Sequence, residues 1–352
     1  MSLFVQIRKK YGNFSLDVKL DNTGNSMGLL GASGCGKSLT LRCIAGIETP
    51  DSGRIVLNGE TLFDSEKGIR LSARKRRTGL LFQNYALFPN MTAEKNIEAG
   101  IRNKKERKRT VEELAALLRI GNKLDRYPWQ LSGGEQQRVA IARVMAYAPD
   151  ILLFDEPFSA LDTFLKEGLQ QDILKVLQGY RGDVLMVSHS REELYRFCRT
   201  IAVMYKGRII ESGDKACIFH KPANLTTAKL TGCKNISAAR RVSDHCIEAL
   251  DWKLCLKTEQ RVPEKTGFVG IRAHYLKPCS EGRGSNVLRV TLEDILEGPF
   301  ENCITLRIDG VSEDRHRISW TVSRQDWENV YGGRPPEFIS IPAEHVLLLN
   351  GT

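Results

Sequence analysis

Residues 28–41 read GLLGASGCGKSLTL, and this stretch decides the fold. Residues 31–38 fit the phosphate-loop pattern G-x-x-x-x-G-K-[ST]. An apolar, strand-like run precedes the loop, and apolar residues at mostly helical spacing follow it. A strand, loop and helix in this order direct unpaired N–H groups and the positive end of the helix dipole at an anion. The sequence therefore predicts a nucleotide site in which Lys37 neutralises the β- and γ-phosphates and Ser38 binds Mg²⁺.

Two adjacent acidic residues are candidates for binding the metal and activating water in such a site. The run ILLFDEP (151–157) places Asp155 at the end of an apolar strand and Glu156 directly after it. Asp155 can hold Mg²⁺ through its water shell, and Glu156 can polarise a water that attacks the γ-phosphate. Acids at strand ends also cap helices, but adjacent acids in a chain with a phosphate loop favour the catalytic interpretation.

Two further polar residues end predicted strands. His189, in LMVSHS, is predicted to contact the γ-phosphate, because open α/β sheets place ligand-contacting groups at the carboxyl ends of their strands. Gln83, in LLFQNYALFP, offers an uncharged amide that can touch both the metal and the attacking water. The alternative for each residue is a structural role, since a lone histidine is more often structural.

The chain changes character along its length. Apolar runs alternate with helical patterns as far as about residue 220, which is typical of a parallel sheet buried on both faces. A helical insert is expected between roughly 90 and 150, with one helix closed by Gly121 and another ended by Pro149. From about residue 235, short strand-like runs separated by Gly, Pro and charged turns indicate a small β-barrel.

The composition fits a globular protein of two or three domains, with 352 residues of which 41% are hydrophobic. The sequence contains no apolar run of about 18 residues and no recognisable signal peptide, so we expect neither a membrane span nor secretion. Nine cysteines lack C-x-x-C spacing, which favours reduced thiols in a cytosolic protein over a zinc site or a disulfide framework.

Much of the net charge of +10 lies in two basic clusters, RLSARKRR (70–77) and RNKKERKR (102–109). Neither cluster interleaves the aromatic residues that single-strand binding uses. We therefore expect both clusters to be solvated surface, and we expect no nucleic-acid partner.

A second glycine-rich stretch, LSGGEQQR (131–138), lies well away from the phosphate loop, although one nucleotide needs only one cradle. Gly133 and Gly134 lead into a predicted helix whose N-terminus is a second anion site.

These motifs, in this order, resemble those of the ATP-binding subunit of ABC transporters over the first 220 residues. The resemblance also includes SALD (159–162), and it implies an ABC-type P-loop ATPase domain over 1–232 with a helical subdomain at about 90–150. It further implies a C-terminal OB-like β-barrel over 233–352, ATP and Mg²⁺ as cofactors, and a homodimer. In that homodimer, Ser132, Gly133 and Gly134 would meet the γ-phosphate held by the phosphate loop of a second copy.

The resemblance also assigns roles to individual residues. The implied catalytic residues are Glu156, His189 and Gln83, and the implied metal ligands are Ser38, Gln83 and Asp155. Tyr11 matches the aromatic residue that stacks on adenine in the family. The implied nucleotide-binding residues are Tyr11, Gly31, Ser33, Gly34, Cys35, Gly36, Lys37, Ser38, Leu39, Ser132, Gly133, Gly134, Glu135 and Asp162.

Three functions compete within this resemblance: a transporter subunit, a soluble ABC ATPase that acts on ribosomes or DNA, and a non-hydrolysing regulator. Lys37 and Ser132 lie too close in sequence for the long coiled coils of DNA-repair relatives. The single cassette disfavours the ribosome-acting relatives, which carry two. Glu156 disfavours the regulator, so the transporter subunit is preferred.

The C-terminal region narrows the expected transport substrate. GFVGIRAHYLKP resembles the appended β-barrels of importer ATPases for molybdate, sulfate, iron, sugars and polyamines. TGCKNIS and LEDILEGPFENCITLRID look most like the molybdate and sulfate branch. We expect an ATPase that powers import of an oxyanion, molybdate or tungstate first and sulfate second. An importer ATPase for iron, sugar or polyamine, or a soluble ABC ATPase unlinked to transport, is the alternative.

The expected partners are a separate integral membrane permease and, indirectly, an external substrate-binding protein. The expected location is the cytoplasmic face of the membrane, as a peripheral subunit. An exposed apolar patch of Tyr85, Leu87, Phe88 and Met91 is predicted to receive a short permease helix, with core packing as the alternative. Cys35 is predicted to be a reactive thiol of lowered pKa, because it lies at a helix N-terminus.

Overall fold

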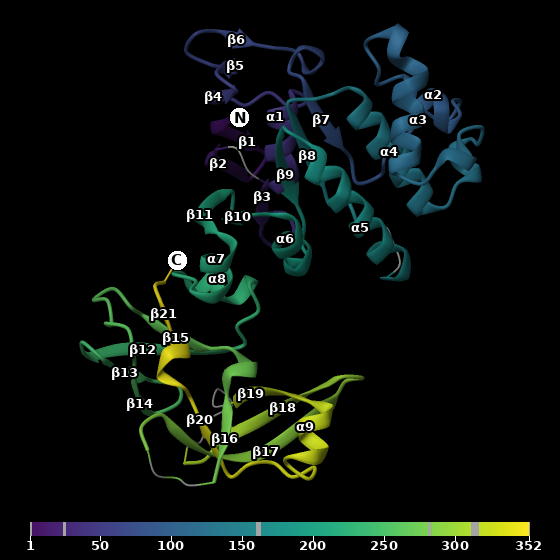
Figure 1. The fold of residues 1–352 in the computed structure, drawn as a ribbon. Coiled ribbons are helices and arrows are strands. Elements are labelled where there is room, and N and C mark those ends of the chain that lie inside the picture. Colours follow the sequence, from purple (N-terminus) through teal and green to yellow (C-terminus); the bar gives the residue numbers. More distant parts are fainter. Residues whose placement is uncertain are drawn as a thin grey trace. The chain divides into compact units, whose positions relative to one another are not determined.

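The computed structural model describes residues 2–23, 26–159, 163–280, 282, 284–310 and 317–351. The chain forms two compact units, Met1–Lys215 and Ala216–Thr352, and each has its own sheets (Figure 1). The sequence predicted a domain boundary between residues 232 and 233. That boundary stays a prediction, because it says where the chain could be cut so that each part folds alone. Across the described ranges, no helix combines the length and the apolar character that crossing a bilayer requires.

The first unit is built on one mixed sheet of eleven strands, in the order β6-β5-β4-β1-β2-β11-β10-β3-β9-β8-β7. The strands from β10 to β7 are mutually parallel, which confirms the predicted α/β class, whereas β4, β1 and β2 pair antiparallel. The strands are β1 (Ser2–Tyr11), β2 (Phe14–Thr23), β3 (Ser26–Leu30), β4 (Ser52–Leu57), β5 (Glu60–Asp64), β6 (Ile69–Arg70), β7 (Thr78–Leu81), β8 (Ile151–Asp155), β9 (Asp183–Val187), β10 (Thr200–Tyr205) and β11 (Arg208–Asp214).

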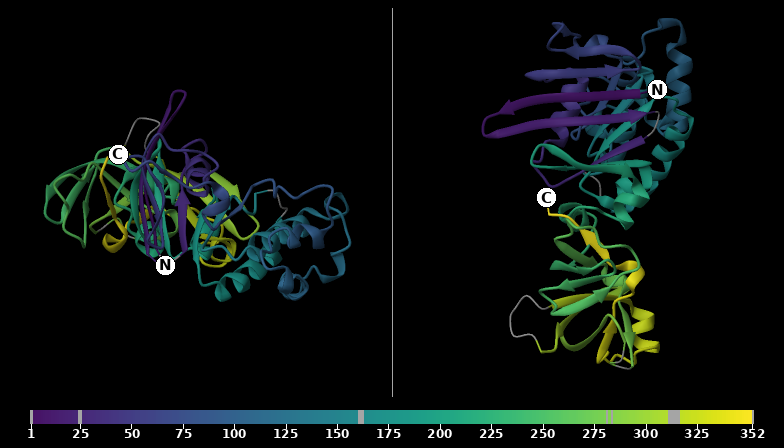
Figure 2. Two further views of the ribbon diagram at one scale, coloured as in Figure 1. Left: turned by 90° about the horizontal axis from the view of Figure 1, so that it is seen from above. Right: turned by 90° about the vertical axis from the view of Figure 1, so that its left-hand side faces the viewer.

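Strands β8 and β9 form the middle of the parallel part and are buried along their whole length. Their sequences, ILLFD and DVLMV, are the continuous apolar runs expected of strands covered on both faces. Helices pack against this part of the sheet, and the blue and teal helices gather on one side of the unit in Figure 2. The helices are α1 (Lys37–Ala45), α2 (Ala93–Glu98), α3 (Arg107–Leu117), α4 (Gly133–Ala146), α5 (Thr163–Gly179) and α6 (Arg191–Phe197).

Helices α2, α3 and α4 pack on one another within the segment predicted to be a helical insert. The helix expected to close at Gly121 ends earlier, at Leu117, so that boundary was wrong. Arg119 takes a left-handed φ of 56°, which ends the helix without a glycine. The amide of Ile120 then bonds to the carbonyl of Ala115 at 2.9 Å, which satisfies one of the last helical carbonyls.

The second unit is a small β domain of two five-stranded sheets, ordered β14-β13-β12-β15-β21 and β16-β20-β17-β18-β19. Apolar residues of both sheets share one buried core. Over the described residues the pairings leave both sheets open, so the predicted closure into a barrel is not observed. The elements are α7 (Lys215–His220), α8 (Leu225–Leu230), β12 (Asn235–Ser243), β13 (Cys246–Ala249), β14 (Leu254–Lys257), β15 (Phe268–Ile271), β16 (Lys277–Cys279), β17 (Val287–Glu297), β18 (Glu301–Ile308), β19 (Arg317–Ser323), α9 (Arg324–Asn329), β20 (Phe338–Ser340) and β21 (Leu347–Leu349).

One residue of the first basic cluster is not solvated, contrary to expectation. Arg76 is 3% exposed. Its Nη1 donates to the carbonyls of Cys43 at 2.7 Å and Ile44 at 2.9 Å, and its Nε donates to the carbonyl of Leu71 at 2.9 Å. The guanidinium therefore caps the C-terminus of α1, where a positive charge is favourable.

We expect Arg76→Ala to lower the free energy of unfolding by about 2–4 kcal/mol, because it leaves buried carbonyls without a donor. Lys75→Ala, an exposed neighbour, is the matched control and should change stability by less than about 0.5 kcal/mol. Urea denaturation followed by circular dichroism measures both. Equal stability of the two variants would contradict the assigned cap.

Candidate functional site

The phosphate loop, residues 31–36, requires glycine at three positions. Gly34 and Gly36 have φ of 77° and 108°, a region that side chains disfavour. A Cβ at Gly36 would also lie 2.7 Å from Leu16 Cδ1, and a Cβ at Gly31 would lie 2.4 Å from the carbonyl oxygen of Met204. The loop can therefore lie against β2 and β10 and lead into α1 only with glycine at these positions.

Lys37 begins α1 and is 5% exposed. Its Nζ donates to the carbonyl oxygens of Gly31 at 2.7 Å and Ala32 at 3.1 Å. The Lys37 side chain thus folds back over the phosphate loop, and its ammonium lies beside the loop that leads into the N-terminus of α1. This position suits a cation that neutralises phosphate oxygens brought to the loop.

Ser38, in the first turn of α1, meets Asp155 at the end of β8, as their predicted roles require. Ser38 Oγ donates to Asp155 Oδ1 at 2.7 Å. Burial raises the pKa of Asp155 above its ordinary value, while the hydrogen bond from Ser38 and the charge of Arg42 act in the opposite direction. A partly desolvated carboxylate gains strongly from a cation placed beside it.

This donor set fits Mg²⁺ bound together with a nucleotide. Mg²⁺ prefers one or two carboxylates plus substrate phosphates over a cage made only of protein ligands. Within the described residues, no cluster of three or more His, Cys, Asp or Glu side chains is arranged to hold a metal alone. Ser38 and Asp155 would hold the ion, which would neutralise charge on the phosphates.

Glu156 lies directly after β8 with a left-handed φ of 48°. Its Oε2 lies 3.3 Å from His189 Nδ1, and its amide donates to the carbonyl of Val187 at 2.9 Å. Ser159 Oγ donates to the Glu156 carbonyl at 3.0 Å, and Gln83 Nε2 reaches Ser159 Oγ at 3.4 Å. The structure therefore brings the three predicted catalytic residues, Glu156, His189 and Gln83, to one edge of the sheet.

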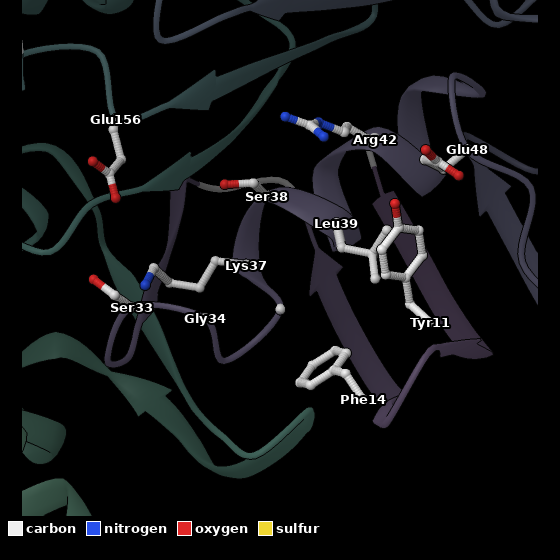
Figure 3. Close-up of a pocket in the computed structure, with 11 residues that line it drawn as sticks. Tyr11, Phe14, Ser33, Gly34, Lys37, Ser38, Leu39, Arg42, Glu48 and Glu156 are labelled. Atoms are coloured by element: carbon white, nitrogen blue, oxygen red, sulfur yellow. The ribbon is translucent and has the colours of Figure 1, made fainter.

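A cavity of about 430 Å³ lies over the phosphate loop. Figure 3 shows Tyr11 and Phe14 on one side of it and Glu156 on the other, with Lys37 and Ser38 between them. Tyr11 is 66% exposed, so its ring is available for stacking. The predicted residues that line the cavity are Tyr11, Ser33, Gly34, Gly36, Lys37, Ser38, Leu39 and Glu156.

Three lining residues were missed in the sequence: Phe14, Arg42 and Glu48. Phe14 pairs with Tyr11 across the β1–β2 hairpin, so the turn at 12–13 was the available signal. Arg42 follows Ser38 by four residues on α1, which places both on one helix face. Glu48 follows the end of α1, and no pattern in the sequence marks it.

Residues 132–135 of the second glycine-rich stretch, which we call the signature, lie at the N-terminus of α4. Ser132 caps α4: its Oγ accepts from the Glu135 amide at 3.3 Å, while Glu135 Oε2 accepts from the Ser132 amide at 2.9 Å. Burial opposes ionisation of Glu135, but the Ser132 amide and the ammonium of Lys123 hold its pKa below its usual value. Among the described residues, the cavity is lined by none of residues 132–135. Asp162 lies outside the described residues.

The segment after Gln83 is only partly the exposed patch that was predicted. Phe88 and Met91 are 46% and 38% exposed, but Tyr85 is 7% exposed. The Tyr85 hydroxyl donates to Gln137 Oε1 at 3.3 Å, and Arg143 Nη2 donates to the Tyr85 carbonyl at 3.1 Å. Tyr85 therefore packs against α4, and its ring is not part of any partner-binding surface at this segment.

Cys35 contradicts the prediction of a reactive thiol. Its side chain is buried, and burial raises its pKa above the ordinary value despite the nearby charge of Lys37. Desolvation of the thiolate therefore outweighs the favourable position before α1.

Comparisons with known proteins agree with this geometry. Residues 12–159 match the family model described as ABC transporter. A sulfate/thiosulfate import ATP-binding protein of Chromobacterium violaceum is 37% identical over 295 residues, covering 82% of this chain and 78% of the relative. An Fe(3+) ions import ATP-binding protein of Photorhabdus laumondii is 34% identical over 279 residues, covering 76% of this chain and 78% of the relative.

A solved structure also resembles the chain. It is the dimeric post-hydrolysis state of the ATP-binding cassette MJ0796 bound to ADP and Pi, with a TM-score of 0.52 and 28% identity. The match covers 61% of this chain and 99% of that chain. The likeness therefore extends over the whole of that cassette and leaves over a third of this chain outside it.

We expect iodoacetamide at pH 8 to modify Cys35 at least about tenfold more slowly than the exposed Cys217 and Cys255, because the Cys35 thiol is buried and its pKa is raised. Peptide mapping by mass spectrometry over a time course measures the rates. Labelling in 6 M urea is the control, and it should make the three rates similar. Fast labelling of Cys35 in the folded chain would contradict its burial.

Proposed function

The chain belongs to the ABC transporter family as an ATP-binding subunit of an importer, and we propose that it powers import of a tetrahedral oxyanion through a separate permease. It binds and hydrolyses ATP, and this hydrolysis is coupled to transport. The relatives are named as import ATP-binding proteins, which supports a membrane permease as the partner of this chain. We place the subunit at the cytoplasmic face of the membrane, with an external binding protein delivering the substrate.

Several contacts support a direct attack of water on the γ-phosphate. Lys37 and the N-terminus of α1 hold the phosphates, and the aromatic wall of Tyr11 and Phe14 accommodates the base. Glu156 accepts a proton from the attacking water, and His189 orients the Glu156 carboxylate from 3.3 Å. Mg²⁺ held by Ser38 and Asp155 would neutralise charge that develops on the phosphates.

The location of the signature supports a site shared between two copies. Ser132 and Gly133 are exposed at the N-terminus of α4, and the cavity over the phosphate loop lacks them among its described lining residues. The MJ0796 cassette is dimeric in the structure that resembles this chain. We therefore propose a homodimer in which the signature of each copy completes the ATP site of the other.

The choice of an oxyanion rests on the second unit, whose segments TGCKNIS and LEDILEGPFENCITLRID look most like the molybdate and sulfate branch. The match to the sulfate/thiosulfate import protein extends over 295 residues, which is more than the 215 residues of the first unit. The likeness to this relative therefore includes part of the second unit. Sulfate, molybdate and tungstate share tetrahedral geometry and a charge of about −2, so they form one class for the test.

The iron-import relative favours a second candidate, because its match also extends beyond the first unit. Iron import by the same ATPase chemistry would leave every contact around the phosphate loop unchanged. Uptake of labelled substrate, with iron alongside the oxyanions, separates the two candidates.

We expect Glu156→Gln to keep ATP binding but to lower phosphate release at least about a hundredfold, because the amide cannot accept the proton of the attacking water. Cells that carry this variant in place of the wild-type chain should lose uptake of labelled sulfate or molybdate. The measurements are phosphate release by the purified chain and uptake by intact cells.

Exposed Glu167→Gln, in α5, is the matched control and should retain both activities. Turnover at the wild-type rate would remove Glu156 from its proposed role. Normal ATPase activity with uptake of iron but no oxyanion would contradict only the proposed substrate.

A further inference from the structure

Three of the four tryptophans are buried and one is not. Trp252, Trp320 and Trp327 are 2%, 2% and 8% exposed, whereas Trp129 is 66% exposed. The Trp129 ring stacks on Tyr127 with centroids 4.6 Å apart and an interplanar angle of 12°. The two rings thus form an exposed aromatic surface, which we call the aromatic step and define as Tyr127 and Trp129.

Hydrogen bonds fix the backbone beneath the aromatic step. Gln136 Nε2, on α4, donates to the carbonyls of Pro128 at 3.0 Å and Leu131 at 3.1 Å. The amide of Tyr127 donates to Gln130 Oε1 at 2.9 Å. A rigid, preorganised aromatic surface loses little conformational freedom when a partner covers it.

The aromatic step adjoins the signature. Trp129 precedes Ser132 by three residues, and Ser132 and Gly133 are themselves exposed. Aromatic residues are enriched where proteins contact one another, especially at the centre of an interface. Three residues span at most about 11 Å, so a partner whose phosphate loop reaches Ser132 comes within about that distance of the Trp129 backbone.

We infer that a second copy of this chain covers the aromatic step when ATP closes the dimer. This inference rests on the proposed shared ATP site and adds an apolar contact beside it. In a twofold-symmetric dimer each signature faces the cavity of the other copy, so the contact forms twice. The surface it meets is the rim of that cavity, where Tyr11 contributes a 66% exposed ring.

Acrylamide quenching of tryptophan fluorescence tests the inference, because Trp129 is the one tryptophan that solvent reaches freely. The full-length Glu156→Gln chain is used with Mg²⁺ and ATP, and size-exclusion chromatography measures its dimerisation in parallel. ATP should reduce the accessible fraction of the fluorescence as the dimer forms. Trp129→Phe should dimerise but lose this change, which assigns the signal.

A second variant tests whether the contact contributes to dimerisation. Trp129→Ala should weaken the ATP-dependent dimer at least about tenfold, which corresponds to about 1.4 kcal/mol. It should leave binding of a fluorescent ATP analogue by the monomer unchanged, because Trp129 does not line the cavity. Leu117→Ala, which shortens a 44% exposed apolar residue of α3, is the matched control and should change neither quantity.

The outcomes separate this inference from the proposed function. If the chain fails to dimerise with ATP, the shared ATP site is contradicted. If it dimerises but Trp129 stays equally quenchable, the shared site stands and the aromatic step is not part of it. Shielding that appears only when the permease is present would assign the surface to the permease and overturn the inference.

Discussion

The phosphate loop depends on glycine at positions 31 and 36. A Cβ at Gly31 would lie 2.4 Å from the carbonyl oxygen of Met204, and Gly36 has a φ of 108°, which side chains disfavour. Helix α1 begins at Lys37, directly after the loop, and Ser38 Oγ lies 2.7 Å from Asp155 Oδ1, which is 117 residues away in sequence. The other residues that line the cavity lie around this junction between the phosphate loop and α1.

Gln137 connects α4, the helix that begins at the signature, to the edge of the sheet where Glu156 lies. Gln137 is fully buried on α4, accepts from the Tyr85 hydroxyl at 3.3 Å and donates to the carbonyl of Pro157, directly after Glu156. Arg143, also on α4, bonds to the carbonyls of Tyr85 and Ala86. A partner that engages the signature therefore acts on a helix in contact with both the Glu156 turn and the segment after Gln83. One helix, α4, therefore contacts both the proposed dimer surface at its N-terminus and the turn that carries Glu156.

The sequence predicted the elements whose patterns are local, but not features that depend on packing between distant segments. The local patterns are the spacing of the phosphate loop, the buried runs of β8 and β9, and the two acids at the end of β8. The structure places these residues as expected. Burial of Arg76 within a basic cluster depends on α1 ending beside it, and burial of Tyr85 depends on Gln137 of α4. Likewise, the strand-like runs of the second unit predicted a β domain. Whether its sheets stay open or close into a barrel depends on pairing between edge strands that are far apart in sequence.

A mixed dimer tests most directly whether each ATP site is shared between two copies. Lys37→Ala removes the ammonium of the phosphate loop, and Ser132→Arg places a bulky charge at the exposed N-terminus of α4. If sites are shared, a dimer of one chain of each kind contains one site with both lesions and one site with neither. Co-expression with two affinity tags, purification over both and counting of retained nucleotide should give about one occluded ATP per mixed dimer and none for either homodimer. A doubly tagged dimer that retains no ATP would contradict the shared site, because each site would then carry a lesion.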